Sequence, residues 1–118
     1  MLLDTSILID ILDGNSTIKS NLKQLNERSF TSVISKYELL KAPKEEDVKF
    51  LLNTMEIYDF EERAAERSAR IFKDLKKKGK MINELDILIA AIAIANDELL
   101  VTRDNDFKNI EQLRLLVL

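Results

Sequence analysis

Hydrophobic and polar positions along the chain follow two different periods, and these periods predict strands and helices in turn. Short runs rich in apolar and β-branched residues predict strands at residues 1–3, 30–33, 56–58, 99–102 and 113–118. Apolar residues spaced three or four apart predict helices at residues 7–12, 18–27, 34–41, 45–53, 60–78 and 85–95, with a helical turn at 106–110. Strand and helix alternate through most of the chain, which predicts an α/β domain with a mainly parallel sheet.

A few residues indicate where these helices end and how deeply they are buried. Pro43 ends the helix over 34–41, and Gly79 ends the helix over 60–78. We expect Thr5 or Ser6 to cap the helix that follows the first strand. The stretch Leu85–Ala95 is apolar on nearly all sides, which predicts a central helix buried in the core.

The composition excludes several kinds of chemistry. The chain contains no cysteine and no histidine, which removes disulfides, thiolate nucleophiles, Ser-His-Asp triads and the usual zinc sites. Two glycines are too few for a GxGxxG or Walker loop. The net charge of −3, from 18 basic and 21 acidic residues, neither requires nor excludes a nucleic-acid partner. Because cysteine and histidine are both absent, any chemistry must use oxygen ligands.

No segment of the chain predicts export or membrane insertion. The start lacks a basic region followed by an apolar run and a cleavage site, so a secretory signal is not expected. The longest apolar stretch, Ile87–Ala95, is far too short to cross a bilayer. We therefore expect one domain over residues 1–118, in the cytoplasm and without a membrane partner.

Four acidic residues that are far apart in the sequence are expected to meet at one edge of the sheet. Asp4 ends the first strand and Asp104 follows the strand at 99–102, so both lie at the carboxyl edge. Glu38 and Asp86 lie near the starts of helices that run back antiparallel to the strands, and such helices begin at that edge. Ligands of open α/β sheets bind in the crevice at this edge, where the strand order reverses.

Each of these acids taken alone also suits an ordinary structural role. Asp4 suits a turn or a cap, and Glu38 suits a solvated helix position. Asp86 suits the first turn of a helix capped by Asn83, and Asp104 suits a polar turn. Four independent placements at one edge are harder to explain in this way. Two carboxylates about 4–5 Å apart repel by roughly 3–4 kcal/mol at an effective dielectric of about 20, so such a cluster takes up protons or binds a cation.

Oxygen ligands alone favour the hard cations Mg²⁺ and Mn²⁺ over zinc. The reaction that such a site serves best is hydrolysis of a phosphodiester bond. Asp4 and Asp104, at strand ends, are expected to be the better-ordered ligands, and Asp86 is expected to bind the same ion. Glu38 either completes the set of ligands or orients the attacking water. Whether one or two metals act is left open.

The order and spacing of these residues resemble those of the PIN domain and, more narrowly, of the VapC-type toxins of type II toxin–antitoxin pairs. The resemblance rests on Asp4-Thr5-Ser6, Thr31-Ser32-Val33-Ile34-Ser35 before Glu38, Asp86 before Leu88-Ile89-Ala90-Ala91, and Thr102-Arg103-Asp104 before Asp106-Phe107. It spans nearly the whole chain and implies a three-layer domain with about four to five strands flanked by helices. Asn83 departs from the pattern, because many relatives have glycine there.

The resemblance implies a Mg²⁺- or Mn²⁺-dependent endoribonuclease that is the toxin of a pair. Its catalytic and metal-binding quartet would be Asp4, Glu38, Asp86 and Asp104. Its supporting residues would be Thr5, Ser6 and Asp106. The resemblance also implies RNA as the substrate, a VapB-like antitoxin that inserts into the acidic cleft, and a homodimer. Apolar residues of the early helices are candidates for these protein interfaces, although about half are expected to be core: Ile7, Leu8, Ile11, Leu12, Leu39 and Leu40.

A nucleic-acid substrate also needs cations along its path. Lys73, Lys77 and Lys80 belong to a lysine cluster that precedes Asp86, and they are candidate RNA-binding residues. These lysines suit equally well a solvated helix C-terminus. Arg103 is the stronger candidate, because its guanidinium adjoins the site and could reach a phosphate.

Three other functions compete with this interpretation. A housekeeping PIN nuclease of RNA processing would lack a neighbouring antitoxin gene. A catalytically inactive PIN fold would bind RNA or protein, and the intact acidic quartet argues against it. A response-regulator-like receiver would need paired acids after its first strand and a lysine after its fifth, and the chain has no such set.

Overall fold

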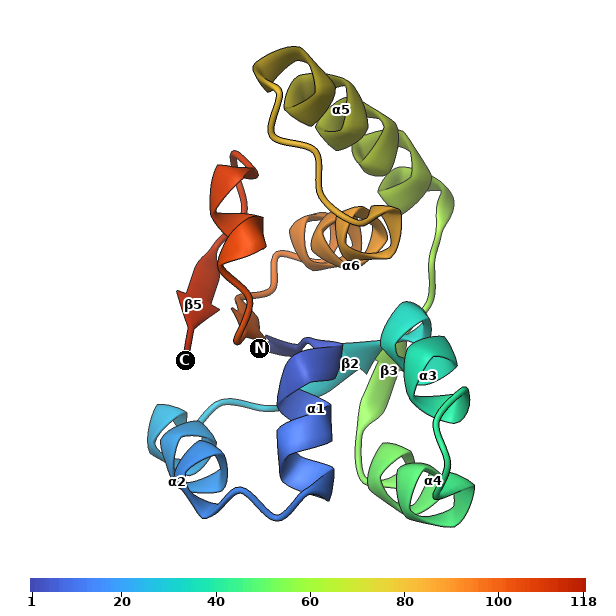
Figure 1. Cartoon of the computed structure of the whole chain (residues 1–118), viewed down its shortest axis with the longest axis vertical. Coiled ribbons are helices and arrows are strands. Elements are labelled where there is room, and N and C mark those ends of the chain that lie inside the picture. The colour runs from blue at the N-terminus through green and yellow to red at the C-terminus, as the bar shows by residue number, and fades with distance from the viewer.

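Five short strands form one parallel sheet at the centre of the structure, a computed structural model that describes all 118 residues (Figure 1). The strands are β1 (Leu2–Leu3), β2 (Phe30–Ser32), β3 (Glu56–Tyr58), β4 (Leu100–Thr102) and β5 (Leu115–Val117). Their order across the sheet is β3-β2-β1-β4-β5, and all neighbouring pairs are parallel. The predicted parallel sheet is confirmed.

Six α-helices and one 3₁₀-helix make up the rest of the regular structure. They are α1 (Thr5–Leu12), α2 (Ser16–Leu25), α3 (Val33–Leu40), α4 (Glu45–Asn53), α5 (Glu62–Lys78), α6 (Glu84–Ala95) and the 3₁₀-helix η1 (Asn105–Asn109). Each helix predicted from the sequence is present, with ends that differ by two residues or fewer. None of them combines the length and the apolar content that a bilayer-spanning helix needs.

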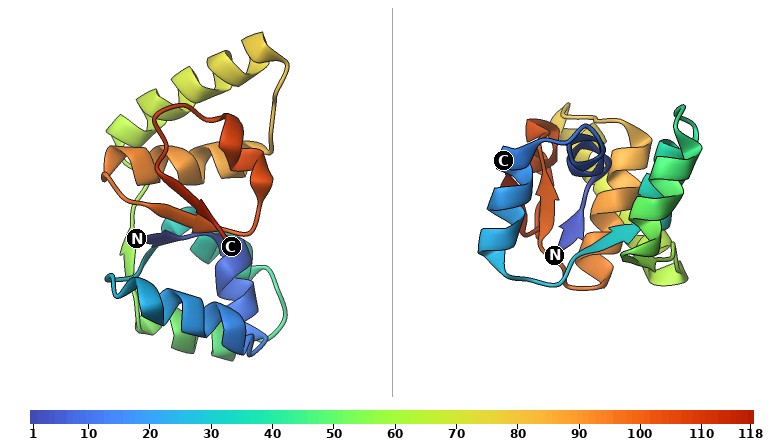
Figure 2. Two further views of the ribbon diagram at one scale, coloured as in Figure 1. Left: turned by 90° about the vertical axis from the view of Figure 1, so that its left-hand side faces the viewer. Right: turned by 90° about the horizontal axis from the view of Figure 1, so that it is seen from below.

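Helices cover both faces of the sheet, which gives three layers (Figures 1 and 2). Alternate residues of each strand face opposite layers. Leu2 of β1 and Leu100 of β4 belong to the hydrophobic cluster of α5, α6 and η1. Leu3 and Val101, the next residues along, belong to the cluster formed with α1, α2 and α4. The central sheet is therefore buried on both faces, as parallel sheets generally are.

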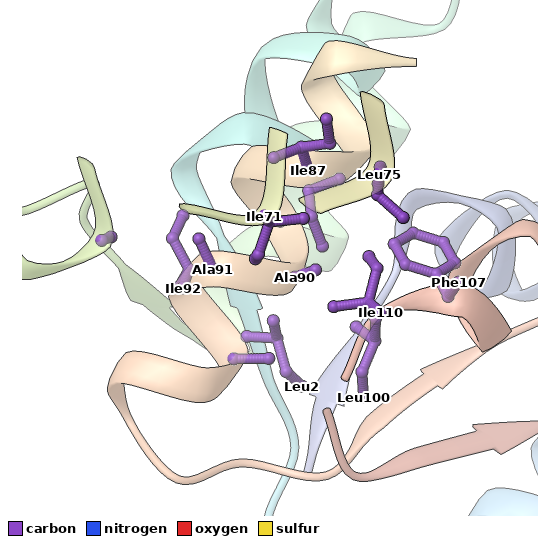
Figure 3. Close-up of a cluster of buried hydrophobic side chains, with 13 residues drawn as sticks. Leu2, Ile71, Leu75, Ile87, Ala90, Ala91, Ile92, Leu100, Phe107 and Ile110 are labelled. Carbon is purple, nitrogen blue, oxygen red and sulfur yellow. The ribbon is translucent and has the colours of Figure 1, made fainter. Parts of the chain in front are cut away.

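Helix α6 is the centre of the larger cluster, where side chains of α5, η1 and the strands converge on it (Figure 3). Its buried residues lie all around the helix: Ile87, Ile89, Ala90, Ala91, Ile92 and Ala93. Ala64, Ile71 and Leu75 of α5 pack in the same cluster. The predicted central helix over 85–95 is thus confirmed, and its rigid burial holds the first turn in place at the edge of the sheet.

Two boundaries differ from prediction at places that matter for the site. The strand predicted over 30–33 ends at Ser32, because the Ser32 hydroxyl accepts a 3.1 Å hydrogen bond from the N–H of Ser35 and caps α3. The helix predicted to start at Ile7 begins at Thr5. The chain passes directly from β2 into α3, and only Asp4 separates β1 from α1. The first turns of α1 and α3 therefore stand at the carboxyl edge of the sheet.

Asp4, and not Thr5 or Ser6, occupies the N-cap position of α1, so the predicted cap is wrong. The Asp4 side chain makes no capping hydrogen bond and faces other partners, described below. β1 lies at the middle of the sheet, and the strands that follow it in sequence are placed on both of its sides. The strand order thus reverses at β1, and Asp4 follows this strand at the edge where parallel α/β sheets bind ligands.

Candidate active site

The register of the sheet brings Asp4 and Thr102 side by side. Leu3 of β1 pairs with Val101 of β4, and the two residues that follow them are Asp4 and Thr102. The N–H of Asp4 still donates to the carbonyl of Val101, over 2.9 Å. Asp4 is 4% exposed and Thr102 is fully buried. A carboxylate is therefore enclosed at the end of the central strand.

The two oxygens of Asp4 have different surroundings. Oδ2 accepts hydrogen bonds from the hydroxyl of Ser6 over 2.9 Å and from the hydroxyl of Thr102 over 2.7 Å. Oδ1 is buried and has no hydrogen-bond partner. No other buried side-chain oxygen or nitrogen of the protein lacks a partner. A buried acceptor without a donor is unfavourable by about 1–3 kcal/mol, so this atom indicates a missing partner.

Glu38 is held by a hydroxyl of α1, and it lies further along α3 than predicted, beyond the first turn at the sixth of its 8 residues. Thr5 Oγ1 donates to Glu38 Oε1 over 2.7 Å and also lies 2.9 Å from the buried hydroxyl of Ser35. Because a carboxylate only accepts, the single Thr5 hydrogen points to Glu38. The predicted supporting roles of Thr5 and Ser6 thus divide between two acids, with Ser6 on Asp4 and Thr5 on Glu38.

Asp86 lies in the first turn of α6, where the side chain of Asn83 accepts from the N–H of Leu85 over 2.9 Å and caps the helix. Burial, and after it the charges of nearby acids, together raise the pKa of Asp86 from 3.8 to about 7. Those acids are Asp4, Glu38, Asp104 and Asp106. Five carboxyls from four separate parts of the chain therefore share one electrostatic environment, which agrees with the convergence that we predicted.

Asp104 combines a structural role with its place in this cluster. Its Oδ1 accepts a 2.8 Å hydrogen bond from the N–H of Asp106 and caps η1. Its own N–H donates to Thr102 Oγ1 over 3.1 Å. The ordinary interpretation of Asp104 as a turn residue is therefore correct, and it leaves Oδ2 without a protein donor. Asp106 is exposed beside it.

The residues present fit a hard divalent cation. All the acids offer oxygen, the ligand that Mg²⁺ and Mn²⁺ prefer, and Asp4 Oδ1 is an enclosed oxygen that lacks a donor. No three of the carboxylates form a ready-made set of direct ligands for one ion. Mg²⁺ usually keeps several waters and binds through one or two carboxylates, so an open arrangement suits it.

The candidate RNA-binding cations form no ion pair with the acids of the cluster. The guanidinium of Arg103 forms an ion pair with Asp10 of α1, with Nη1 2.5 Å from Oδ2. Lys73, Lys77 and Lys80 are exposed at the end of α5 and just after it, and none of them forms an ion pair. Their predicted role in RNA binding stays a prediction.

Three residues of this region were not predicted from the sequence: Ser35, Asp10 and Thr102. Ser35 and Asp10 act through Thr5 and Arg103, and no sequence pattern pairs them. Thr102 could have been found from the sequence. When the segments Leu2-Leu3-Asp4 and Leu100-Val101-Thr102 are aligned as neighbouring parallel strands, Thr102 lies beside Asp4.

The profile of the PIN domain family matches residues 1–113. The chain therefore belongs to the PIN domain family, as the resemblance in its sequence predicted. Among curated proteins it is similar to two ribonucleases of Methanocaldococcus jannaschii. Ribonuclease VapC3 is 33% identical over 92 residues, which cover 76% of this chain and 94% of the relative. Ribonuclease VapC1 is 30% identical over 118 residues, which cover 97% of this chain and 81% of the relative.

Solved structures of toxin–antitoxin complexes share the fold. VapBC2 from Rickettsia felis, bound to a DNA fragment from their promoter, has a TM-score of 0.87 at 29% identity and covers 99% of this chain and 97% of the neighbour. VapBC-1 from nontypeable Haemophilus influenzae has a TM-score of 0.86 at 25% identity and covers 98% of this chain and 96% of the neighbour. The predicted fold class and family are confirmed.

Proposed function

We propose that this chain is a divalent-metal-dependent endoribonuclease and the toxin of a VapBC-type toxin–antitoxin pair. The observation that carries the proposal is Asp4 Oδ1, a buried carboxylate oxygen without a donor among five acids. A cation beside this atom supplies the missing partner and relieves the mutual repulsion of the carboxylates. The relatives named ribonuclease VapC support RNA as the substrate.

The residues of the site have different roles in phosphodiester hydrolysis. Asp4, Asp86 and Asp104 would hold Mg²⁺ or Mn²⁺, directly or through water, and Glu38 would complete the set or orient the attacking water. The ion supplies charge stabilisation for the phosphate and activation of that water. Because the chain has no histidine, the proton of the water would pass to a carboxylate of the site or to solvent. Asp106 supports Asp104 at the exposed rim.

RNA binding uses cations around the acidic cluster. Arg103 is the candidate next to Asp104 in the sequence, and Lys73, Lys77 and Lys80 lie at the end of α5 and just after it. In a metal-dependent nuclease these side chains contact phosphates that flank the cleaved bond. Cellular RNA as substrate implies action in the cytoplasm.

The partner proteins follow from the neighbours, which are complexes named VapBC. We extend to this chain a VapB-like antitoxin and, from the family, a homodimer. Of the apolar residues predicted for these interfaces, Ile7, Leu8 and Leu39 are buried core. The other three remain partly exposed and are available for protein contacts: Ile11, Leu12 and Leu40.

The proposal is tested by cleavage of labelled RNA with Mg²⁺, with Mn²⁺ and with EDTA, comparing the wild type with Asp4→Asn. Asn keeps an oxygen for the two hydroxyls but removes the charge, so folding should be retained while cleavage falls by orders of magnitude. Asp47→Asn, which changes an exposed acid of α4 by the same charge, is the matched control. If neither the wild type nor Asp4→Asn shows any metal-dependent cleavage of RNA, the result would instead favour a non-catalytic PIN module.

Co-expression with the product of a small neighbouring gene separates the toxin from a housekeeping nuclease. A toxin should arrest growth when expressed alone, and the partner should relieve the arrest and co-purify with the chain. A nuclease active on RNA, without growth arrest and without such a partner, would support the housekeeping alternative.

A further inference from the structure

Two successive N–H groups of the turn after β4 are connected to Asp4 through two hydroxyls. The N–H of Arg103 donates to Ser6 Oγ over 3.1 Å, and the Ser6 hydroxyl donates to Asp4 Oδ2 over 2.9 Å. The N–H of Asp104 donates to Thr102 Oγ1 over 3.1 Å, and the Thr102 hydroxyl donates to the same Oδ2 over 2.7 Å. The two chains of hydrogen bonds run in parallel to one carboxylate oxygen.

The direction of each hydroxyl hydrogen follows from its neighbours. A backbone N–H can only donate and an ionised carboxylate can only accept, so both hydroxyls receive a hydrogen bond from behind and pass one to Asp4. Hydrogen bonds in such a series polarise and strengthen one another. Both hydroxyls donate to Oδ2, and Oδ1 of the same carboxylate is left without a donor.

Thr102 differs from Ser6 in what its hydroxyl joins. Ser6 connects Asp4 to the backbone of Arg103, whereas Thr102 connects Asp4 to the backbone of Asp104. Thr102 is therefore the only side chain that hydrogen-bonds to two residues of the acidic quartet. It is fully buried at the end of β4, and a β-branched residue in a strand has few accessible rotamers.

We propose that Thr102 is a positioning residue of the metal site. Its hydroxyl fixes the orientation of the Asp4 carboxylate, whose Oδ1 has no donor, and its oxygen accepts from the backbone of Asp104, so one side chain sets the spacing between two proposed ligands. The inference rests on the proposed metal-dependent function. Groups that orient metal ligands in this way change metal affinity or activity by about 10–100-fold when they are removed.

The test measures Mn²⁺ binding calorimetrically on the full chain, in the absence of RNA. Thr102→Val keeps the shape and removes the hydroxyl, and it should weaken Mn²⁺ binding by about 10–100-fold. Thr102→Ser keeps the hydroxyl and should bind Mn²⁺ within a few-fold of the wild type. In cleavage assays at saturating metal, Thr102→Val should lower kcat and leave KM for RNA nearly unchanged.

Thr31→Val is a matched control for the loss of a buried threonine hydroxyl. Thr31 is also fully buried, at the middle of β2, and its hydroxyl donates to the carbonyl of Leu3 over 2.9 Å without touching an acid. This variant should lose thermal stability to a similar extent as Thr102→Val. It should bind Mn²⁺ as the wild type does, which separates a positioning role from a merely structural one.

Several outcomes would overturn the inference. Wild-type Mn²⁺ affinity in Thr102→Val shows that Thr102 is structural only, and equal losses in the Ser and Val variants show that the hydroxyl is not the cause. If Thr102→Val does not fold, the pair Thr102→Ser and Thr102→Ala gives the same comparison, and equal affinity in that pair rejects the role. A wild type that binds no Mn²⁺ rejects the proposed function itself, a result that differs from normal wild-type binding with an unaffected variant.

Discussion

The hydroxyl of Thr5, the first residue of α1, donates a 2.7 Å hydrogen bond to Oε1 of Glu38 in the middle of α3. Behind it, Ser35 lies 2.9 Å from Thr5, and Ser32 lies 3.4 Å from Ser35. Because Thr5 donates to the carboxylate, Ser35 is left to donate to Thr5. A row of hydroxyls thus runs from the end of β2 to the acid, and it orients Glu38 as Thr102 and Ser6 orient Asp4.

Removing the Thr5 hydroxyl should therefore free Glu38 and reduce cleavage. We expect Thr5→Val to lower kcat by about 10–100-fold and Thr5→Ser to restore most of it, because serine offers the same donor. RNA cleavage under single-turnover conditions checks this. If Thr5→Val cleaves as fast as the wild type, the orientation of Glu38 does not limit the reaction.

The raised pKa of Asp86 predicts an unusual dependence of stability on pH. Below about pH 4 the carboxyl is protonated in both the folded and the unfolded chain. Between about pH 4 and 7 only the folded chain keeps this proton, because its pKa is about 7 instead of 3.8. The folded state then binds more protons than the unfolded state, so the contribution of Asp86 to stability falls as pH rises through this window.

The measurement is denaturant unfolding of the metal-free protein in EDTA between pH 4.5 and 8, comparing wild type with Asp86→Asn. The neutral Asn should remove this part of the slope and leave the variant more stable than the wild type near pH 8. Asp47→Asn should keep the wild-type slope. Parallel curves for wild type and Asp86→Asn would show that Asp86 is ionised normally in the folded protein.

Binding of Mg²⁺ at Asp86 should stabilise the folded protein more at high pH, where the carboxyl has lost its proton. Mg²⁺ binds the ionised cluster and competes with the proton on Asp86, so the increase in melting temperature caused by Mg²⁺ should be larger at pH 8 than at pH 6. The increase should vanish in Asp86→Asn. An equal increase at both pH values, or an increase retained in the variant, would place the ion elsewhere.

The sequence alone was sufficient to predict the fold and the edge of the sheet at which the acids meet, for reasons visible in particular residues. The nearly continuous apolar stretch over 85–95 predicted the buried α6, and Gly79 predicted the end of α5, where it adopts a left-handed conformation with φ of 68°. Strand ends and helix starts meet at one edge of any parallel α/β sheet. This rule accounts for Asp4, Asp86 and Asp104, whereas Glu38 lies beyond the first turn of α3 and was predicted closer to the helix start than it is.

The partners of these acids could not be predicted, because they depend on strand register and on side-chain direction. Thr102 meets Asp4 only because Leu3 pairs with Val101, and a shift of one residue would turn its hydroxyl to the other face. Arg103 was expected to face a substrate phosphate, and its ion pair with Asp10 depends on how α1 lies against the turn after β4. Such contacts join residues more than 90 positions apart in the sequence.

The packing of α5 against α6 should be essential for stability although it lies outside the acidic cluster. Leu75 is fully buried in the cluster centred on α6. Leu75→Ala removes a large side chain and leaves a cavity, so the free energy of unfolding should fall by about 2–5 kcal/mol. Urea denaturation measures this change. Lys76→Ala, the next and exposed position, should change stability by less than about 0.5 kcal/mol.

The ion pair between Arg103 and Asp10 makes a prediction about RNA binding that separates the two roles of the arginine. If Arg103 contacts a phosphate, Arg103→Gln should weaken binding of a single-stranded RNA in EDTA and reduce the salt slope of log K by about 0.7 per lost contact. Asp10→Asn releases the guanidinium from its partner and should strengthen binding.

Stability should hardly change in either variant, because partly exposed ion pairs contribute about 0–1 kcal/mol. Fluorescence anisotropy at several salt concentrations gives both the affinity and the slope. Lys19→Gln, which removes an exposed cation of α2, controls for net charge. An unchanged slope in Arg103→Gln would mean that the arginine serves only to hold α1 against the turn after β4, and the path of the RNA would then have to be sought along the lysines of α5.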